Sequence, residues 1–355
     1  MNKKLFVTIF VFAAVLLLTG CAKGQMPSSW TGVTASEGFV YLANATNVYA
    51  VNVDTGAQVW KYQVKASAYA APRLTGDGQL IIGGYDHVLY SLNPQSGLAS
   101  GLGLWPFKGA HDRYIGSPLV TSDTIYAPNA DYNLYALDLQ GQLKWNFKAD
   151  QALWATPATD DNNVYFGSLG GKFYSLNAAT GAKNWDIKVD TAVLSTPVVK
   201  DGVVYVTTFT GNLLALESAT GKTIWSKPAA DRIWSGPVLE GDLLYFGDIS
   251  GGLYAYDLKG NLVWQQKLNG GIVGLPAINN NTLIVGTDSG NIYVISLDGK
   301  DIVWQAMVPG ETTGTVYAPP VVAGKLILVA PTDGSNFLVA LDGDGLTKWV
   351  FNPSK

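Results

Sequence analysis

The sequence predicts an all-β fold, an eight-bladed β-propeller of four-stranded antiparallel blades. Inside each repeat, apolar residues alternate with a period of two between turns rich in Gly, Asp and Thr. Proline opens repeats two to eight, at Pro72, Pro118, Pro157, Pro197, Pro237, Pro276 and Pro320. A tryptophan closes each repeat at intervals of about 40 to 45 residues, the length of one propeller blade: Trp60, Trp105, Trp145, Trp185, Trp225, Trp264, Trp304 and Trp349.

The clearest repeat runs from Ser195 to Trp225 and predicts four strands separated by three tight turns. In chain order the strands are Pro197–Val199, Val203–Thr207, Leu213–Leu216 and a last strand that carries Trp225. One such blade cannot bury both of its faces, so the repeats are expected to stack in a closed ring, with each tryptophan a structural anchor between blades.

The chain begins with a predicted lipoprotein signal peptide, residues 1–20. Lys3 and Lys4 precede the apolar run Leu5–Leu18, which is shorter than the roughly 20 residues of a membrane-spanning helix. The ending Leu18-Thr19-Gly20-Cys21 resembles a bacterial lipobox, which predicts lipidation of Cys21. Residues 21–29 then form a tether and residues 30–355 the propeller. The alternative is an ordinary secretory signal followed by an accidental cysteine.

Blade one is expected near Val33 and at Phe39–Ala43, Val48–Val53 and Gln58–Val64. Blade two is irregular, since a longer Gly- and Ser-rich segment, Asn93–Leu104, replaces its usual last turn. Blades three to eight are expected to end near residues 148, 189, 227, 268, 308 and 351.

Composition indicates an exported β protein with a large core. The chain contains 40 glycines, 12% aromatic residues and 14% charged residues. Its formal net charge is −4 and it has no basic cluster, so nucleic acid is not an expected partner. Its one cysteine excludes an intramolecular disulfide.

The repeated phrase x-D-x-x-T-G-x-x-x-W, preceded by small-x-P-V-V, resembles the quinoprotein, or PQQ-like, propeller repeat across about residues 30–352. Eight such repeats behind a lipobox resemble the BamB family of lipoproteins. That resemblance implies a non-catalytic scaffold, lipid-anchored in the cell envelope, that binds proteins of the outer-membrane β-barrel assembly machinery. Because Ala22 rather than Asp follows the cysteine, the segment resembles lipoproteins sent to the outer membrane, which is the expected location if the cell has one. The ring is expected to be monomeric.

Two other functions stay open: a cell-envelope sensor or ligand-binding lipoprotein, and a quinone-dependent dehydrogenase. The resemblance to such dehydrogenases implies a vicinal cysteine disulfide, a catalytic Asp and a calcium site. The sequence provides no second cysteine, and its two histidines, His87 and His111, have no matching carboxylates. The segment Asp342–Gly345 lacks the later ligands of a calcium loop. We therefore expect no enzyme activity, no metal and no cofactor.

The candidate binding residues stand three positions before each opening proline, where the outer strand of one blade leads to the inner strand of the next. All are large and apolar, and they are expected to ring the mouth of the central channel, beside acidic turns at Asp86, Asp131, Asp248, Asp288 and Asp333. The alternative is that they only seal neighbouring blades. The predicted partner-binding residues are Tyr69, Trp154, Leu194, Trp234 and Tyr317, together with Tyr114, which adjoins Ile115; Ile115 and Val273 belong to the same series.

Overall fold

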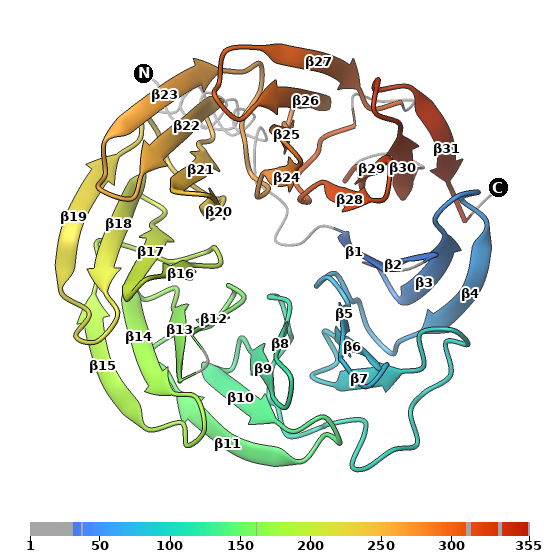
Figure 1. The fold of residues 1–355 in the computed structure, drawn as a ribbon. Helices are drawn as coiled ribbons and strands as arrows, with labels where there is room; N and C mark the ends of the chain where they lie inside the picture. Colours follow the sequence, from blue (N-terminus) through green and yellow to red (C-terminus); the bar gives the residue numbers. More distant parts are fainter. Residues whose placement is uncertain (1–30, 37, 161, 310–313, 333–335, 354–355) are drawn as a thin grey trace, which may run out of the picture.

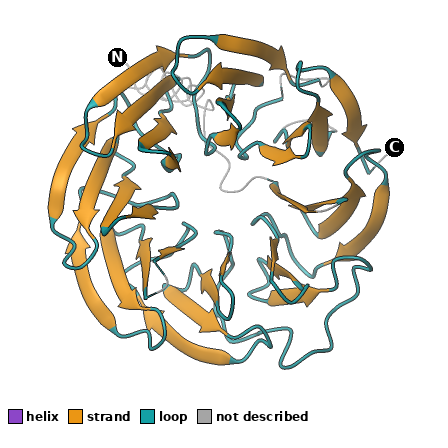
Figure 2. Cartoon of the chain, viewed as in Figure 1, coloured by secondary structure: helices purple, strands orange, loops and turns teal. Residues whose placement is uncertain are grey.

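The computed structural model describes residues 31–36, 38–160, 162–309, 314–332 and 336–353. Within these ranges the chain forms strands and turns arranged as eight sheets around a central axis, which confirms the predicted eight-bladed propeller (Figures 1 and 2). The described part of the chain contains no apolar helix of membrane-spanning length. The signal peptide, Cys21 and the tether lie outside the described residues.

Each blade is one continuous stretch of chain whose strands run in order from the central channel to the outer edge of the propeller. The first four blades contain β1 Gly32–Ser36, β2 Phe39–Asn44, β3 Asn47–Asn52, β4 Gln58–Gln63; β5 Arg73–Leu74, β6 Leu80–Gly83, β7 Leu89–Leu92; β8 Leu119–Val120, β9 Ile125–Pro128, β10 Asn133–Leu137, β11 Leu143–Lys148; β12 Ala158–Thr159, β13 Asn163–Gly167, β14 Lys172–Asn177, β15 Lys183–Lys188. The last four contain β16 Val198–Lys200, β17 Val203–Thr207, β18 Asn212–Glu217, β19 Thr223–Pro228; β20 Val238–Glu240, β21 Leu243–Gly247, β22 Gly252–Asp257, β23 Leu262–Lys267; β24 Ala277–Asn279, β25 Thr282–Gly286, β26 Asn291–Ser296, β27 Ile302–Met307; β28 Val321–Ala323, β29 Leu326–Val329, β30 Leu338–Leu341, β31 Thr347–Phe351.

The core lies between blades. The centres of the two middle strands of a blade are buried on both faces and are mostly apolar, and each hydrophobic cluster joins residues of two neighbouring blades. The outermost strands alternate between buried and exposed residues because their outer side faces solvent. Stacking around the ring therefore buries the faces that a single blade would leave exposed.

Every closing tryptophan lies at a junction between blades. Its indole N–H donates a hydrogen bond to a backbone carbonyl in the last turn of the next blade, at 2.7–3.1 Å in all eight cases. The last of these bonds closes the ring: Trp349 of blade eight donates to the carbonyl of Val53 in blade one, at 2.9 Å.

The same indole packs against a glycine in that turn. At Gly56, which has a φ of +71°, an added Cβ would lie 2.7 Å from the ring of Trp349. The position therefore needs glycine for its backbone angle and for space. The turn is further held by the Asn52 side chain, which accepts hydrogen bonds from the backbone N–H groups of Asp54 and Thr55.

Blade two has three named strands, unlike the other blades, and the predicted irregularity lies there. Its fourth position is occupied by the segment after Leu92, which pairs only through two isolated bridges, Leu89 to Phe107 and Leu92 to Ala99. The indole N–H of Trp105 still donates a hydrogen bond to the backbone carbonyl of Leu139 in blade three, so this junction has the same contact as the others despite the longer loop.

Candidate functional site

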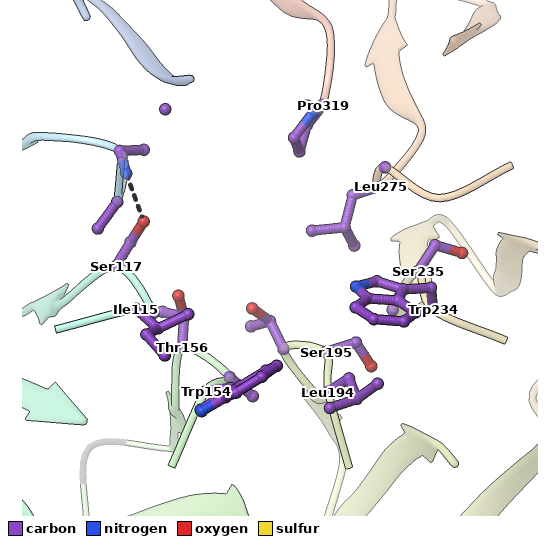
Figure 3. Close-up of a pocket in the computed structure, with 18 of the residues that line it drawn as sticks. Ile115, Ser117, Trp154, Thr156, Leu194, Ser195, Trp234, Ser235, Leu275 and Pro319 are labelled. Carbon is purple, nitrogen blue, oxygen red and sulfur yellow. Dashed lines mark hydrogen bonds between the residues drawn. The ribbon is translucent and has the colours of Figure 1, made fainter. Parts of the chain in front are cut away.

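The loops that enter the inner strands line the central channel. Their residues alternate in direction, and six of the large apolar residues predicted from the sequence face a cavity of about 290 Å³. Figure 3 shows the side chains of Ile115, Trp154, Leu194 and Trp234 around this space. The six are Tyr69, Ile115, Trp154, Leu194, Trp234 and Val273; Tyr317 is half-buried and is not among the lining residues.

The residue just before each of these positions points the other way and fills the space between blades. All seven are buried, with 0–2% exposure: Ala68, Tyr114, Leu153, Val193, Ile233, Ile272 and Val316. Sealing between blades is thus the role of this preceding residue. Tyr114 belongs to the buried series, which corrects its expected place at the channel mouth.

Two sets of backbone hydrogen bonds hold these loops in place. In seven blades the turn between the second and third strands donates an N–H to the loop that enters the same blade, as Tyr85 does to Ser67, at distances of 2.7–3.1 Å. The buried residue of the loop donates in turn to the preceding blade, as Ile272 does to Asp248 at 2.9 Å. Backbone hydrogen bonds therefore hold most of the loops at the channel mouth to their own blade and to the preceding one.

Two arginine–aromatic clusters lie on the loops at the channel mouth. Tyr69 meets Tyr85 edge-on, with ring centroids 5.6 Å apart, and the Arg113 guanidinium lies 5.7 Å from the Tyr85 centroid. The second cluster consists of Trp234, Phe209 and Arg232, with distances of 5.5 and 5.7 Å. Both arginines stand five residues before an opening proline and are about half exposed. Each cluster presents a cation beside an aromatic surface.

Two of the acidic residues expected beside the channel mouth, Asp131 and Asp248, also hold their turns in place. Asp248 is fully buried and accepts hydrogen bonds from the backbone of Ser250 and Gly252 and from the Tyr254 hydroxyl. Burial and this carboxylate raise the pKa of Tyr254 to about 12. Asp131 similarly accepts from the backbone N–H of His111 and from a tyrosine hydroxyl. Asp333 lies outside the described residues.

The donor set does not fit a quinone cofactor held with calcium. The described residues include no group of three or more His, Cys, Asp or Glu side chains that could hold a metal ion. His87 and His111 are both exposed. The chain also lacks the second cysteine that a vicinal disulfide requires. We therefore derive no reaction step for this site.

Arg73 is a cavity residue that sequence reasoning missed. It follows Pro72 at the start of β5 and is the one charged residue among those that line the cavity. The available signal was its position in the repeat, since the residue after each of the other opening prolines is Leu, Ala or Val.

Comparisons with known proteins support these findings. The model of the family described as outer membrane protein assembly factor BamB matches residues 22–152, 140–271 and 254–354. The crystal structure of BamB from Moraxella catarrhalis is similar with a TM-score of 0.69 and 19% identity, covering 87% of this chain and 92% of that one. The computationally designed Ika8 protein is similar with a TM-score of 0.77 and 14% identity, covering 90% and 98%.

A search of curated proteins gave no match. The two structural likenesses concern the fold, whereas the family match spans nearly the whole chain in three overlapping segments. The chain belongs to the BamB family of PQQ-like propeller proteins.

Proposed function

We propose that this chain is a non-catalytic, lipid-anchored scaffold that binds a protein of the outer-membrane β-barrel assembly machinery through its channel mouth. The observation that carries the proposal is the ring of large apolar side chains, on loops held by backbone hydrogen bonds, in which Trp154 and Trp234 are only half-buried. Half-exposed aromatic residues on a rigid platform are typical anchors of protein interfaces. The family match supports a partner in barrel assembly.

The anchor is proposed at Cys21, at the end of the lipobox. Cys21→Ser should abolish incorporation of labelled palmitate and move the protein out of the membrane fraction. We further propose that the anchored ring acts as a monomer in the outer membrane. A protein that stays membrane-bound and labelled after Cys21→Ser would contradict the anchor.

The partner surface is tested by pull-down from detergent-solubilised membranes, with the barrel component identified by mass spectrometry. Trp154→Ala/Trp234→Ala should reduce its recovery by about tenfold or more, since each aromatic anchor contributes about 2 kcal/mol. The matched control is Ile302→Ala/Val303→Ala, which removes two exposed apolar side chains from the outer strand β27.

Thermal melting of the same variants separates binding from folding. The proposal expects a small change in melting temperature together with lost recovery for the tryptophan pair, and full recovery for the control. Unchanged recovery with the tryptophan pair, or equal loss with the control, would contradict docking at the channel mouth.

A further inference from the structure

Arg73 occupies a position where the other blades carry no charge. Arg73 pairs with Ile81 of the second strand of its blade. In each other blade, one residue of the innermost strand pairs with the equivalent position of the second strand. Those seven residues are Thr34, Leu119, Ala158, Val198, Val238, Ala277 and Val321. Of these eight positions only Arg73 and Val321 line the cavity, so Arg73 brings a single charge into a place that the other blades fill with uncharged side chains.

This guanidinium has no partner among the described residues. It forms no ion pair with a carboxylate, although every other described arginine has an acidic neighbour within 4 Å. The cavity wall around it consists of apolar side chains, glycines and small hydroxyl residues such as Ser117 and Thr156. Burial lowers the pKa of Arg73 below its ordinary value. Arg73 is partly exposed to the cavity, so its guanidinium is only partly desolvated and remains open to an anionic ligand.

The wall selects the class of anion. An arginine fork pairs two oxygens of a carboxylate in one plane. The lining residues provide no second cation for a doubly charged phosphate, and large apolar surface lies in the same cavity, on Trp154, Leu194 and Trp234. A volume of about 290 Å³ stands at the lower end of the range for ligand pockets, enough for one small ring or side chain.

We propose that the central cavity binds a carboxylate attached to a single aromatic or aliphatic group. Arg73 pairs with the carboxylate, and the ring of apolar side chains holds the attached group. The carboxylate belongs either to a free small acid or to the last residue of a peptide that enters from the channel mouth. This site shares its ring of apolar side chains with the docking surface proposed above, and Arg73 is the residue that only the carboxylate site requires.

Isothermal titration of the full chain in detergent tests the site with two matched pairs of probes: benzoate against benzamide, and a five-residue peptide ending in phenylalanine as free acid against its C-terminal amide. At least one acid should bind, and its amide should bind about tenfold to a hundredfold more weakly, the loss expected for a charged hydrogen bond. Benzoate binding identifies a free small acid, and binding of the peptide acid alone identifies a chain terminus.

Arg73→Gln should weaken acid binding by the same factor, while Lys222→Gln, which removes an exposed positive charge in the last turn of blade five, outside the cavity, should leave it unchanged. The proposal is overturned by the absence of binding for both acids, by equal binding of acids and amides, or by acid binding to Arg73→Gln as tight as to the wild type.

Melting temperatures provide a second readout that separates a ligand site from a structural role. Arg73→Met should melt at the same or a higher temperature than the wild type when ligand is absent, and saturating acid should raise the melting temperature of the wild type alone. A much lower melting temperature for Arg73→Met would overturn the proposal, because Arg73 would then stabilise the fold. Pull-down recovery with Arg73→Gln should be unchanged, which distinguishes this site from the docking surface.

Discussion

The indole of each closing tryptophan performs two tasks at once. Its N–H donates to the next blade and its ring covers a glycine there, as at Trp349 and Gly56. Trp349 is 9% exposed and closes the ring, so its removal affects the junction between the two ends of the propeller.

Trp349→Ala should lower the free energy of unfolding by about 3 to 5 kcal/mol, the usual cost of truncating a buried tryptophan. Trp349→Phe retains most of the packing and loses the hydrogen bond, so it should cost about 1 kcal/mol from that bond. Urea unfolding measures both. Val350→Ala, at a neighbouring exposed position, should change stability little.

Gly56→Ala tests the other side of the same contact. The new methyl group would collide with the indole of Trp349 and would sit at a positive φ, so the variant should be destabilised. In a Trp349→Ala background the collision disappears and only the backbone strain is left, so the two substitutions should be less than additive. Full additivity in urea unfolding would show that the indole and the glycine do not interact.

Asp248 should make stability depend on acid pH. Burial alone raises the pKa of its carboxyl group, but hydrogen bonds from Ser250, Tyr254 and Gly252 outweigh burial and leave the pKa below its ordinary value of 3.8. A lowered pKa in the folded state gives stability that is present above pH 4 and is lost as the pH falls through the folded value.

Asp248→Asn should therefore flatten the fall in unfolding free energy below pH 4, and should cost about 1 to 3 kcal/mol at neutral pH because buried donors lose their acceptor. Chemical unfolding at several pH values from 6 to 2 measures both effects. An unchanged acid slope would exclude Asp248 as a contributor.

At the scale of single residues, the sequence predicted the apolar residues that line the cavity but not the charged residue among them. The large residue three places before each proline was recognisable because it recurs. Arg73 occurs once, and nothing in a single repeat indicates that its charge lies unpaired inside a cavity. Tyr114 resembled a residue of the channel mouth because it is large and aromatic. In the extended loop, however, neighbouring side chains point to opposite sides, so Tyr114 is buried between blades whereas Ile115 lines the cavity.

The loops between blades act as extended elements with two distinct faces. In the loop into blade four, Leu153 is fully buried between blades whereas its neighbour Trp154 lines the cavity. Because neighbouring side chains of the extended loop point to opposite sides, one residue stabilises the packing between blades while the next is available for binding.

Leu153→Ala should destabilise the protein by about 2 to 5 kcal/mol because it leaves a cavity between packed blades. Trp154→Ala should cost less, although it removes the larger side chain, because part of that side chain already faces solvent. Thermal and urea unfolding of the two variants give the comparison. The reverse order would place Trp154 in the sealing role and weaken the proposed docking surface.

The blades were predictable as elements because their periodicity and turn residues agree along the sequence. Turns such as Asn52 to Gly56 recur with the same side-chain chemistry, which identifies the strands on either side. The fourth position of blade two was less predictable, because its pairing consists of bridges between distant residues such as Leu89 and Phe107. Local periodicity does not report such pairs.

The whole ring depends on contacts between its two ends. Blade one and blade eight share a hydrophobic cluster that includes Leu42, Tyr49, Leu328 and Trp349. Closure covers the faces that would be exposed at the ends of an open array. The blade count followed from the tryptophans, because each marks one junction and the number of junctions in a closed ring equals the number of blades.

Deleting residues 347–355 removes β31 together with Trp349, so the ring should fail to close. We expect loss of the single cooperative thermal transition and rapid proteolysis, since the cluster between the end blades would be exposed. Near-ultraviolet circular dichroism and limited trypsin digestion measure this. Deletion of residues 354–355 alone is the control and should melt as the full chain does; a cooperative transition in the longer deletion would show that the other junctions suffice.

The repetition of one junction also bears on how such a chain changes in evolution. Each blade is encoded by one uninterrupted segment, and each segment carries both halves of the contact, a tryptophan for the blade that follows and a glycine turn for the blade that precedes. A gene duplication or loss that spans one whole segment joins ends that are already compatible. The number of blades can therefore change by whole blades. Features such as Arg73 and the two arginine–aromatic clusters occur in some blades only, and they leave the junctions between blades unchanged.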